Sequence, residues 1–396
     1  MNQKPTVQFS LIQGLMWGGY ACIFAFASVY LLAKGFTNTQ VGYIIAAGGA
    51  AAALLQPLAG TIADRSRKLI LHRMIIILCL VLILFSVLLL LSGSRLWITA
   101  LLFPLLNALL HVITPLTYSL GMFFIERGVP VNFGICRGIG SITFALLSAL
   151  LGVLVNRINE DVVLYAFILL AVLMIFSTAT FHFKGVDETK TTSGDTVSSG
   201  RAGLFRFLKT YRRFIMVLLG NTLVFISHTI LTVYLYQVVT YHGYTSREMG
   251  FATTLAALCE LPALFGLSVL NRKKKTAGLY RISLVFFFLK NLILFLAGSL
   301  PMIYFAMCMH LLGYGLYAGS SVLYVNETVD TIYQSTGQAL MTATCSVGTV
   351  AGSILGGKLL DITGVPGMLF LSGLSVLAGV IIVFIFSSQR RIPVRK

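Results

Sequence analysis

Long uninterrupted blocks of apolar residues decide what this chain folds into. The stretches "LILHRMIIILCLVLILFSVLLLLSG" and "MLFLSGLSVLAGVIIVFIF" each supply close to the roughly 20 residues that a helix needs to cross a bilayer core of about 30 Å. Such blocks recur along the whole chain, in which 57% of residues are hydrophobic and 10% are charged. The sequence therefore predicts an all-α membrane protein with many spanning helices and excludes an ordinary soluble domain.

Twelve apolar blocks are expected to span the membrane. The first is too long for the core of a signal peptide and is interpreted as a spanning helix. The blocks are 9–33, 40–63, 73–92, 96–122, 135–156, 161–183, 212–238, 246–270, 279–299, 301–325, 337–360 and 366–387. The polar stretch "KGVDETKTTSGDTVSSGRAG" separates the sixth block from the seventh. We therefore expect a six-helix half over 1–183, a flexible cytoplasmic linker over 184–211 and a second six-helix half over 212–396.

The distribution of basic residues indicates how the chain is oriented in the membrane. The formal net charge is +17, and most Lys and Arg residues fall in the segments that are cytoplasmic if the N-terminus is cytoplasmic. The positive-inside rule then places both termini in the cytoplasm, and we expect a multi-pass protein of the plasma or inner membrane. The surplus favours contact with anionic lipid and argues against a nucleic-acid partner. Six cysteines stand singly among apolar residues and are interpreted as packing residues.

The two halves echo each other. "GTIADRSRK" after the second block is answered by "GLSVLNRKKK" after the eighth, and "GICRGIGSITFALLSALLG" is answered by "GQALMTATCSVGTVAGSILGG". Internal repeats of this kind are typical of secondary transporters. Together with the helix count and the linker, the first motif resembles the signature of the major facilitator superfamily, and the resemblance covers the full chain. It implies two pseudo-symmetric six-helix halves, alternating access, a monomer, and a conformational gate at Gly60, Asp64, Arg65, Arg67 and Lys68.

Ionisable residues deep in the apolar blocks are costly and mark candidate sites. They are Arg137, Glu260, Lys290, His111, His228 and His310. For each kind of ionisable residue, a purely structural interpretation stays open. Arg137 is close enough to the membrane edge to reach water, Glu260 and Lys290 could form a purely structural pair, and His111 and His228 could be hydrogen-bonded packing residues.

Three segments carry a more specific resemblance to one group within the superfamily. "NFGICRGIGSITFALLSALLG", "CMHLLGYGLYAG" and "CELP" resemble segments of the proton symporters related to lactose permease and phenylpropionate permease. That resemblance implies a substrate-contacting role for Arg137 and His310, with Lys290 at the position of a basic residue in helix 9. The galactose-binding pattern is absent, since Tyr118 and Phe144 stand where a glutamate and a tryptophan are found in lactose permease.

The proton-carrying glutamate of lactose permease is also replaced, by Gly313. Glu260 is then the one carboxylate predicted deep in a helix, and we expect it to carry the coupling proton with Lys290 and His310. Arg137 and Phe144, seven residues apart, share a helix face that suits a sugar, a nucleoside or an aromatic carboxylate. With Tyr118, His228 and His310 they form the predicted substrate site.

These residues predict a proton-coupled symporter that imports a small organic solute, such as a sugar or oligosaccharide. A proton-coupled efflux antiporter for drugs or metabolites, with the same fold, is the alternative; against it, the fifth block lacks the Gly-Pro motif of such exporters. No enzymatic activity, cofactor or metal site is expected, because no catalytic or metal-ligand constellation is recognisable. "GSILGGKLL" lacks the features of a phosphate-binding loop, and Gly348, Gly352 and Gly356 instead predict a face for close helix contact.

Overall fold

The fold is helical throughout the part of the chain that is described. The computed structural model describes residues 4–65, 68–93, 95–181, 207–273 and 276–387, without the side chains of 63–65, 68–70 and 264–273, and contains no strand in these ranges. Nine helices in them are long and apolar enough to cross a membrane, or ten when one bent pair is counted as a single span. The protein is therefore a multi-pass membrane protein, as predicted. Most of the predicted linker 184–211 lies outside the described residues.

The described helices separate into two compact units. The first comprises the described residues of 1–192 together with 243–257, and the second those of 193–242 together with 258–396. Helices of the first unit are α1 (Lys4–Tyr20), η1 (Ala21–Ala25), α2 (Ala27–Ala33), α3 (Asn38–Arg65), α4 (Lys68–Ser92), α5 (Leu96–Ile125), α6 (Phe133–Arg157) and α7 (Val162–Thr180). Helix α11 (Ser246–Lys273) begins in the first unit and ends in the second.

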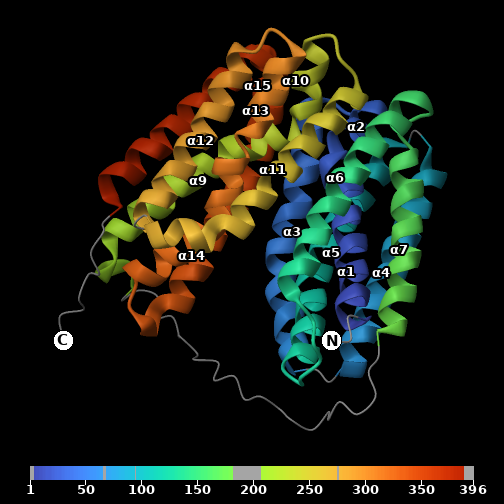
Figure 1. Ribbon diagram of the computed structural model, residues 1–396. Coiled ribbons are helices and arrows are strands. Elements are labelled where there is room, and N and C mark those ends of the chain that lie inside the picture. The colour runs from blue at the N-terminus through green and yellow to red at the C-terminus, as the bar shows by residue number, and fades with distance from the viewer. Residues whose placement is uncertain (1–3, 66–67, 94, 182–206, 274–275, 388–396) are drawn as a thin grey trace. The chain divides into compact units, whose positions relative to one another are not determined.

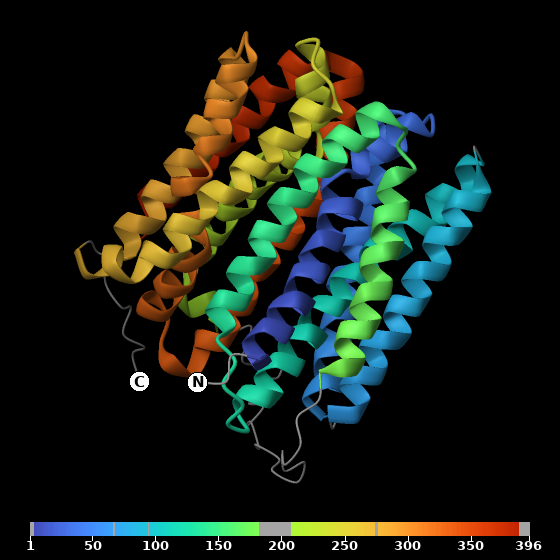
Figure 2. The ribbon, with the colours of Figure 1, turned by 45° about the vertical axis from the view of Figure 1, so that its right-hand side comes forward.

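In the first unit α1 is a central element. It packs along α6 and also contacts α5 and α7, while α5 packs against α3 and α4 (Figures 1 and 2). Small residues let α1 approach α6: a methyl group added at Gly14 would lie 2.8 Å from the Thr143 hydroxyl, and one added at Gly140 would lie 2.5 Å from the Trp17 ring. These close approaches hold the α1 side chains against α6, where the candidate residue Arg137 is located.

The second unit is built on α9 and α15. Its helices are α9 (Arg212–Val233), α10 (Leu235–Tyr241), α12 (Thr276–Leu296), α13 (Leu300–Cys308), η2 (Leu311–Gly315), α14 (Leu316–Thr328), η3 (Thr331–Tyr333) and α15 (Gln334–Phe386). Helix α9 packs along α15, and α12 contacts α13, α14 and α15. Helix α15 is bent at Gly364, whose φ of 67° favours glycine, so this one element contains two of the predicted spans, 337–360 and 366–387.

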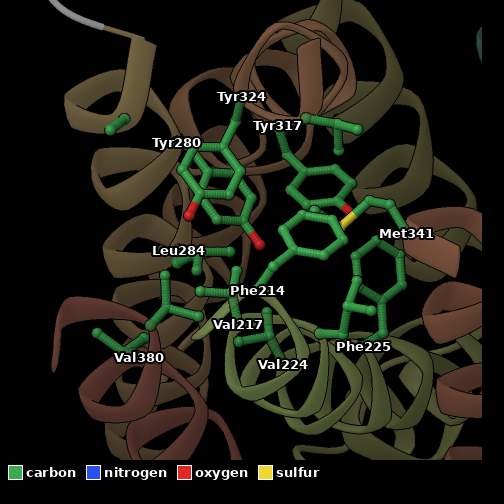
Figure 3. Close-up of a cluster of buried hydrophobic side chains, with 14 of the residues drawn as sticks. Phe214, Val217, Val224, Phe225, Tyr280, Leu284, Tyr317, Tyr324, Met341 and Val380 are labelled. Carbon is green, nitrogen blue, oxygen red and sulfur yellow. The ribbon is translucent and has the colours of Figure 1, made fainter. Parts of the chain in front are cut away.

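The core of the second unit combines aromatic stacking with a buried amide. Figure 3 shows Tyr280 and Tyr324 side by side, and their rings stack with centroids 4.9 Å apart. The Asn221 side chain is fully buried: it donates to the Tyr317 hydroxyl at 3.0 Å and to the Thr344 hydroxyl at 2.7 Å, and accepts from the Tyr280 hydroxyl at 2.9 Å. Since an unpaired amide would be costly here, these bonds join α9, α12, α14 and α15 at defined positions.

The internal repeat is visible in how the helices begin. Thr37 and Gln40 exchange side-chain bonds with each other's backbone N–H groups ahead of α3, at 3.0 and 3.3 Å. At the same interval as separates the two sequence halves, the Glu248 carboxylate accepts from the backbone N–H of Thr245 at 2.9 Å and from its hydroxyl at 2.6 Å, ahead of α11. Both are capping boxes, in which a Thr and a Gln or Glu three residues later satisfy the free end of a helix.

Breaks and close contacts recur with the same spacing. The first span bends by 44° after η1, at Phe26, and the seventh is interrupted at Tyr234. The contact of Gly140 with Trp17 in the first unit corresponds to the contact of Gly348 with Phe225 in the second. The two halves therefore share helix breaks and close glycine contacts as well as a helix order. Continuous spans were expected from the sequence at both breaks.

The predicted glycine face of the eleventh block is confirmed. Methyl groups added at Gly348, Gly352 and Gly356 would lie 2.5 Å from Phe225 Cβ, 2.6 Å from the Ile226 carbonyl oxygen and 2.4 Å from the Tyr234 ring. All three contacts are with α9 or the residue that follows it. Glycine at these positions is what allows α9 and α15 to touch through their backbones.

We expect Gly352→Ala to lower the free energy of unfolding by about 1–3 kcal/mol, because the Ile226 carbonyl is backbone and cannot rotate away from the new methyl group. The matched control is Gly278→Ala on α12, where no atom of the described residues lies within 4 Å of the added methyl group. Thermal unfolding in detergent would check both variants. Equal unfolding temperatures for the two variants would contradict the close contact.

Candidate functional site

Three of the predicted charged residues form a chain in the second unit. The Nδ1 atom of His310 lies 3.1 Å from Nζ of Lys290, and its Nε2 atom lies 3.4 Å from Oε1 of Glu260. Lys290 is 4% exposed and His310 is 9% exposed, so both polar groups are removed from solvent. Instead of the simple pair expected from the sequence, the imidazole of His310 lies between the ammonium group and the carboxylate.

Two further aromatic rings lie against this chain. The Tyr314 ring stacks on His228, with centroids 5.3 Å apart and an interplanar angle of 15°, and on His310, at 5.8 Å and 26°. The His228 and His310 rings are 5.6 Å apart. Four of the residues predicted from the sequence, Glu260, Lys290, His228 and His310, are thus gathered with Tyr314, which the sequence did not single out.

The local backbone explains why His310 is held there. Helix α13 ends just before His310, and the turn that follows, η2, is a π-helix in which the Gly315 N–H bonds to the His310 carbonyl at 2.9 Å. Turns of this kind are rare and often occur at functional sites. A methyl group at Gly315 would lie 3.2 Å from the Glu260 carbonyl oxygen, so the glycine permits the contact between η2 and α11.

Arg137 lies in the first unit, half-buried on α6. Its guanidinium donates to the Ser141 hydroxyl at 2.6 Å, one turn further along, and lies 4.0 Å from the centre of the Trp17 ring. A guanidinium over an indole face is a favourable cation–π arrangement. The side chain is thereby held flat, with edges that suit the oxygens of a carboxylate or of neighbouring hydroxyls.

A second polar group in the first unit centres on His111. The Tyr20 hydroxyl is 3.0 Å from His111 Nδ1 and 2.8 Å from the Thr114 hydroxyl. The Gln56 amide donates to the His111 carbonyl at 3.0 Å, which ties α3 to α5. The Trp17 and Tyr20 rings lie next to each other on α1, with centroids 5.2 Å apart and a tilt of 31°, so the same helix face contacts both Arg137 and His111.

The remaining candidates are less closely joined to these groups. Phe144 is half-buried on α6, and Tyr118 is half-buried on α5 with its ring edge-on to Phe133 at 5.4 Å. A methyl group at Gly60 would meet no atom of the described residues within 4 Å. Arg67 and the side chains of Asp64, Arg65 and Lys68 lie outside the described residues, and the predicted gate stays a prediction.

Sequence reasoning missed Trp17, Tyr20 and Tyr314. Trp17 is one of only two tryptophans in the chain, and Tyr20 follows it by one turn. Tyr314 stands four residues after His310, the spacing of neighbours on one helix face. Spacing from a suspected site residue was therefore the available signal. In the described residues no group of three His, Cys, Asp or Glu side chains is arranged to hold a metal ion.

Comparisons with known proteins place the chain in a family. The model of the MFS_1 like family matches residues 8–371. Maltose permease of Geobacillus stearothermophilus is 32% identical over 162 residues, which span 40% of this chain and 40% of the permease. That match covers well under two thirds of the permease.

Solved transporters share the fold. The structure of the nucleoside transporter NupG superposes with a TM-score of 0.79 at 15% identity, covering 98% of this chain and 99% of NupG. The D-xylose-proton symporter superposes with a TM-score of 0.71 at 13% identity, covering 98% and 99%. The predicted fold and the predicted superfamily are thus confirmed: the chain belongs to the MFS_1 like family and is a major facilitator superfamily transporter.

Proposed function

We propose that this transporter imports a small organic solute together with protons. The observation that carries the proposal is the chain Glu260–His310–Lys290 inside the second unit. An imidazole with one protonated nitrogen donates to the carboxylate from Nε2 and accepts from the ammonium at Nδ1. Protonation of Glu260 removes the charge that balances Lys290, so the arrangement has two distinct electrostatic states.

The solute site of the proposal lies around Arg137. The flat guanidinium over Trp17 offers hydrogen bonds to oxygens, and the half-buried Trp17 ring beside it offers an apolar surface for a ring. Phe144, Tyr118, His228 and His310 remain the other proposed substrate contacts. A sugar or oligosaccharide, a nucleoside or an aromatic carboxylate fits this chemistry. Insertion in the plasma or inner membrane as a monomer, with cytoplasmic termini and anionic lipid around them, belongs to the same proposal.

Uptake into proteoliposomes tests the proposal. Vesicles containing the purified protein are given radiolabelled maltose, xylose, uridine or phenylpropionate, with the outside more acidic than the inside or at equal pH. We expect at least one solute to accumulate above its outside concentration only when the pH gradient is present, and a protonophore to abolish the accumulation. Loss of a preloaded solute driven by the same gradient would favour efflux instead.

We expect Arg137→Lys to weaken binding of the accumulated solute about ten-fold or more, because the ammonium keeps the charge but loses the planar fork. The matched control is Ser141→Ala, which removes one hydrogen bond to Arg137 and leaves the guanidinium over Trp17. Half-saturation of exchange at equal pH measures both variants. Wild-type affinity in Arg137→Lys would contradict a role in gripping the solute.

We expect Glu260→Gln to abolish accumulation driven by a pH gradient and to leave exchange between equal solute concentrations largely intact. The amide resembles the permanently protonated carboxyl, so the variant cycles only in its loaded form. Accumulation and exchange are measured in the same vesicles.

If Glu260 and Lys290 form a purely structural ion pair, a different result is expected for the same variant. Removing one partner would then leave an uncompensated buried charge at a cost of about 3–5 kcal/mol, and Glu260→Gln would express poorly. The double variant Glu260→Gln with Lys290→Met removes both charges. If it restores expression and gradient-driven accumulation together, the proton-carrier role of Glu260 is refuted.

A further inference from the structure

We propose that His242 is a second proton-binding site, separate from the Glu260–His310–Lys290 chain, at which the doubly protonated ring bonds the end of α10 and the end of α12 at the same time. The residue follows the last residue of α10 and is half-buried. Its Nδ1 atom lies 3.0 Å from the Val238 carbonyl oxygen, and its Nε2 atom lies 2.6 Å from the Ala297 carbonyl oxygen.

The inference follows from the identity of the two partners. Backbone carbonyl oxygens only accept hydrogen bonds, so each ring nitrogen must donate to make its bond. A neutral imidazole has one N–H group and one lone pair, and satisfies one carbonyl. The imidazolium has two N–H groups and satisfies both. The geometry around His242 is therefore complete only when the ring carries a second proton.

The position favours a cation for an independent reason. Val238 belongs to the last turn of α10, where carbonyl groups have no partner inside the helix and carry a partial negative charge. At the corresponding point of the first unit, where the first span ends, Lys34 caps α2. Its ammonium lies 2.7 Å from Asp161 and 3.5 Å from Glu160. The repeat thus places a lysine at this point in one unit and a histidine in the other.

The charged and titratable residues closest to His242 along the chain are Tyr236, Tyr241, Tyr244, Arg247 and Glu248. On its own element, the Tyr241 ring meets the imidazole edge-on at 5.2 Å. On α15, which also packs against α10, Lys358 and Asp361 are the charged residues closest in sequence to the bend, and Asp361 acts electrostatically on Tyr234 at the start of α10. On α12 the site contact is the Ala297 carbonyl just past the helix end.

The clamp connects two helices that carry candidate site residues. Helix α10 continues the seventh span beyond the break at Tyr234, and that span carries His228. Ala297 follows the C-terminus of α12, two turns after Lys290. A proton on His242 therefore fixes the far ends of the His228 and Lys290 helices to each other. After deprotonation the neutral ring keeps only one of its two bonds, to Ala297 or to Val238, so the junction at the end of α10 loses one net hydrogen bond and opens about five-fold more often.

Hydrogen–deuterium exchange of the peptide 235–241 in detergent tests the clamp without any transported solute. Wild type is compared with His242→Phe at the same pH, so that the intrinsic pH dependence of exchange cancels. We expect wild type to exchange about five-fold more slowly than His242→Phe at pH 5.5 and to approach it at pH 8. His242→Arg, with several permanent donors, is expected to keep the slow rate at both pH values. Tyr241→Phe, the matched control, keeps the pH dependence of wild type.

A pH-independent ratio between wild type and His242→Phe would overturn the proposal. Where the variants fold poorly, ¹⁵N NMR of the unaltered protein labelled at its six histidines gives the same answer. A ring with both nitrogens protonated and protected from solvent exchange at pH 5.5, absent in His242→Gln, supports the clamp. Solvent-exposed behaviour of every doubly protonated ring overturns it. Neither readout depends on proton-coupled uptake, so the proposed function and the clamp fail separately.

Discussion

The structure of the second unit depends on compensating the charge of one buried ammonium group, that of Lys290. Lys290 is buried among apolar helices, where an uncompensated charge costs several kcal/mol. The imidazole of His310 contacts this ammonium group through Nδ1, and the carboxylate of Glu260 lies at the other nitrogen of the imidazole. Three separate segments, α11, α12 and the junction of α13 with η2, must therefore meet at one point. The π turn that positions His310 and the glycine at residue 315 that admits α11 both serve this requirement.

The two units use one scaffold for different chemistry. Capping boxes ahead of α3 and α11, helix breaks at Phe26 and Tyr234, and glycine–aromatic contacts at Gly140 and Gly348 recur at one sequence interval. The side chains on this scaffold have diverged. In the first unit a guanidinium lies over an indole, and in the second an imidazole bridges an acid and a base. At this interval Glu260, Lys290 and His310 correspond to Ala52, Leu82 and Leu102, so the repeat supplies the scaffold but not the positions of the polar groups.

Much of this was readable in the sequence, for identifiable reasons. Hydropathy reveals spanning helices because the bilayer demands about 20 apolar residues in a row, and glycines spaced by four reveal a contact face because the helix period is fixed. The geometry of side-chain pairs could not be predicted from the sequence in this way. Glu260 and Lys290 were expected to pair, but His310, which precedes the π turn, lies between them, and no residue pattern marks a change from i→i+4 to i→i+5 bonding. Trp17 was missed because its role depends on Gly140, which belongs to another helix.

The placement of hydrogen bonds constrains how coupling could work. The hydrogen bonds of Arg137 and His111 described above lie inside the first unit, and those of His310 lie inside the second. Both groups are thus held by contacts within their own units. Under the proposed coupling, a proton on Glu260 then acts through its nearest partner, because it weakens the bond to His310 and leaves Lys290 less balanced. The response passes to η2 and Tyr314, the elements attached to His310, before it reaches any more distant helix.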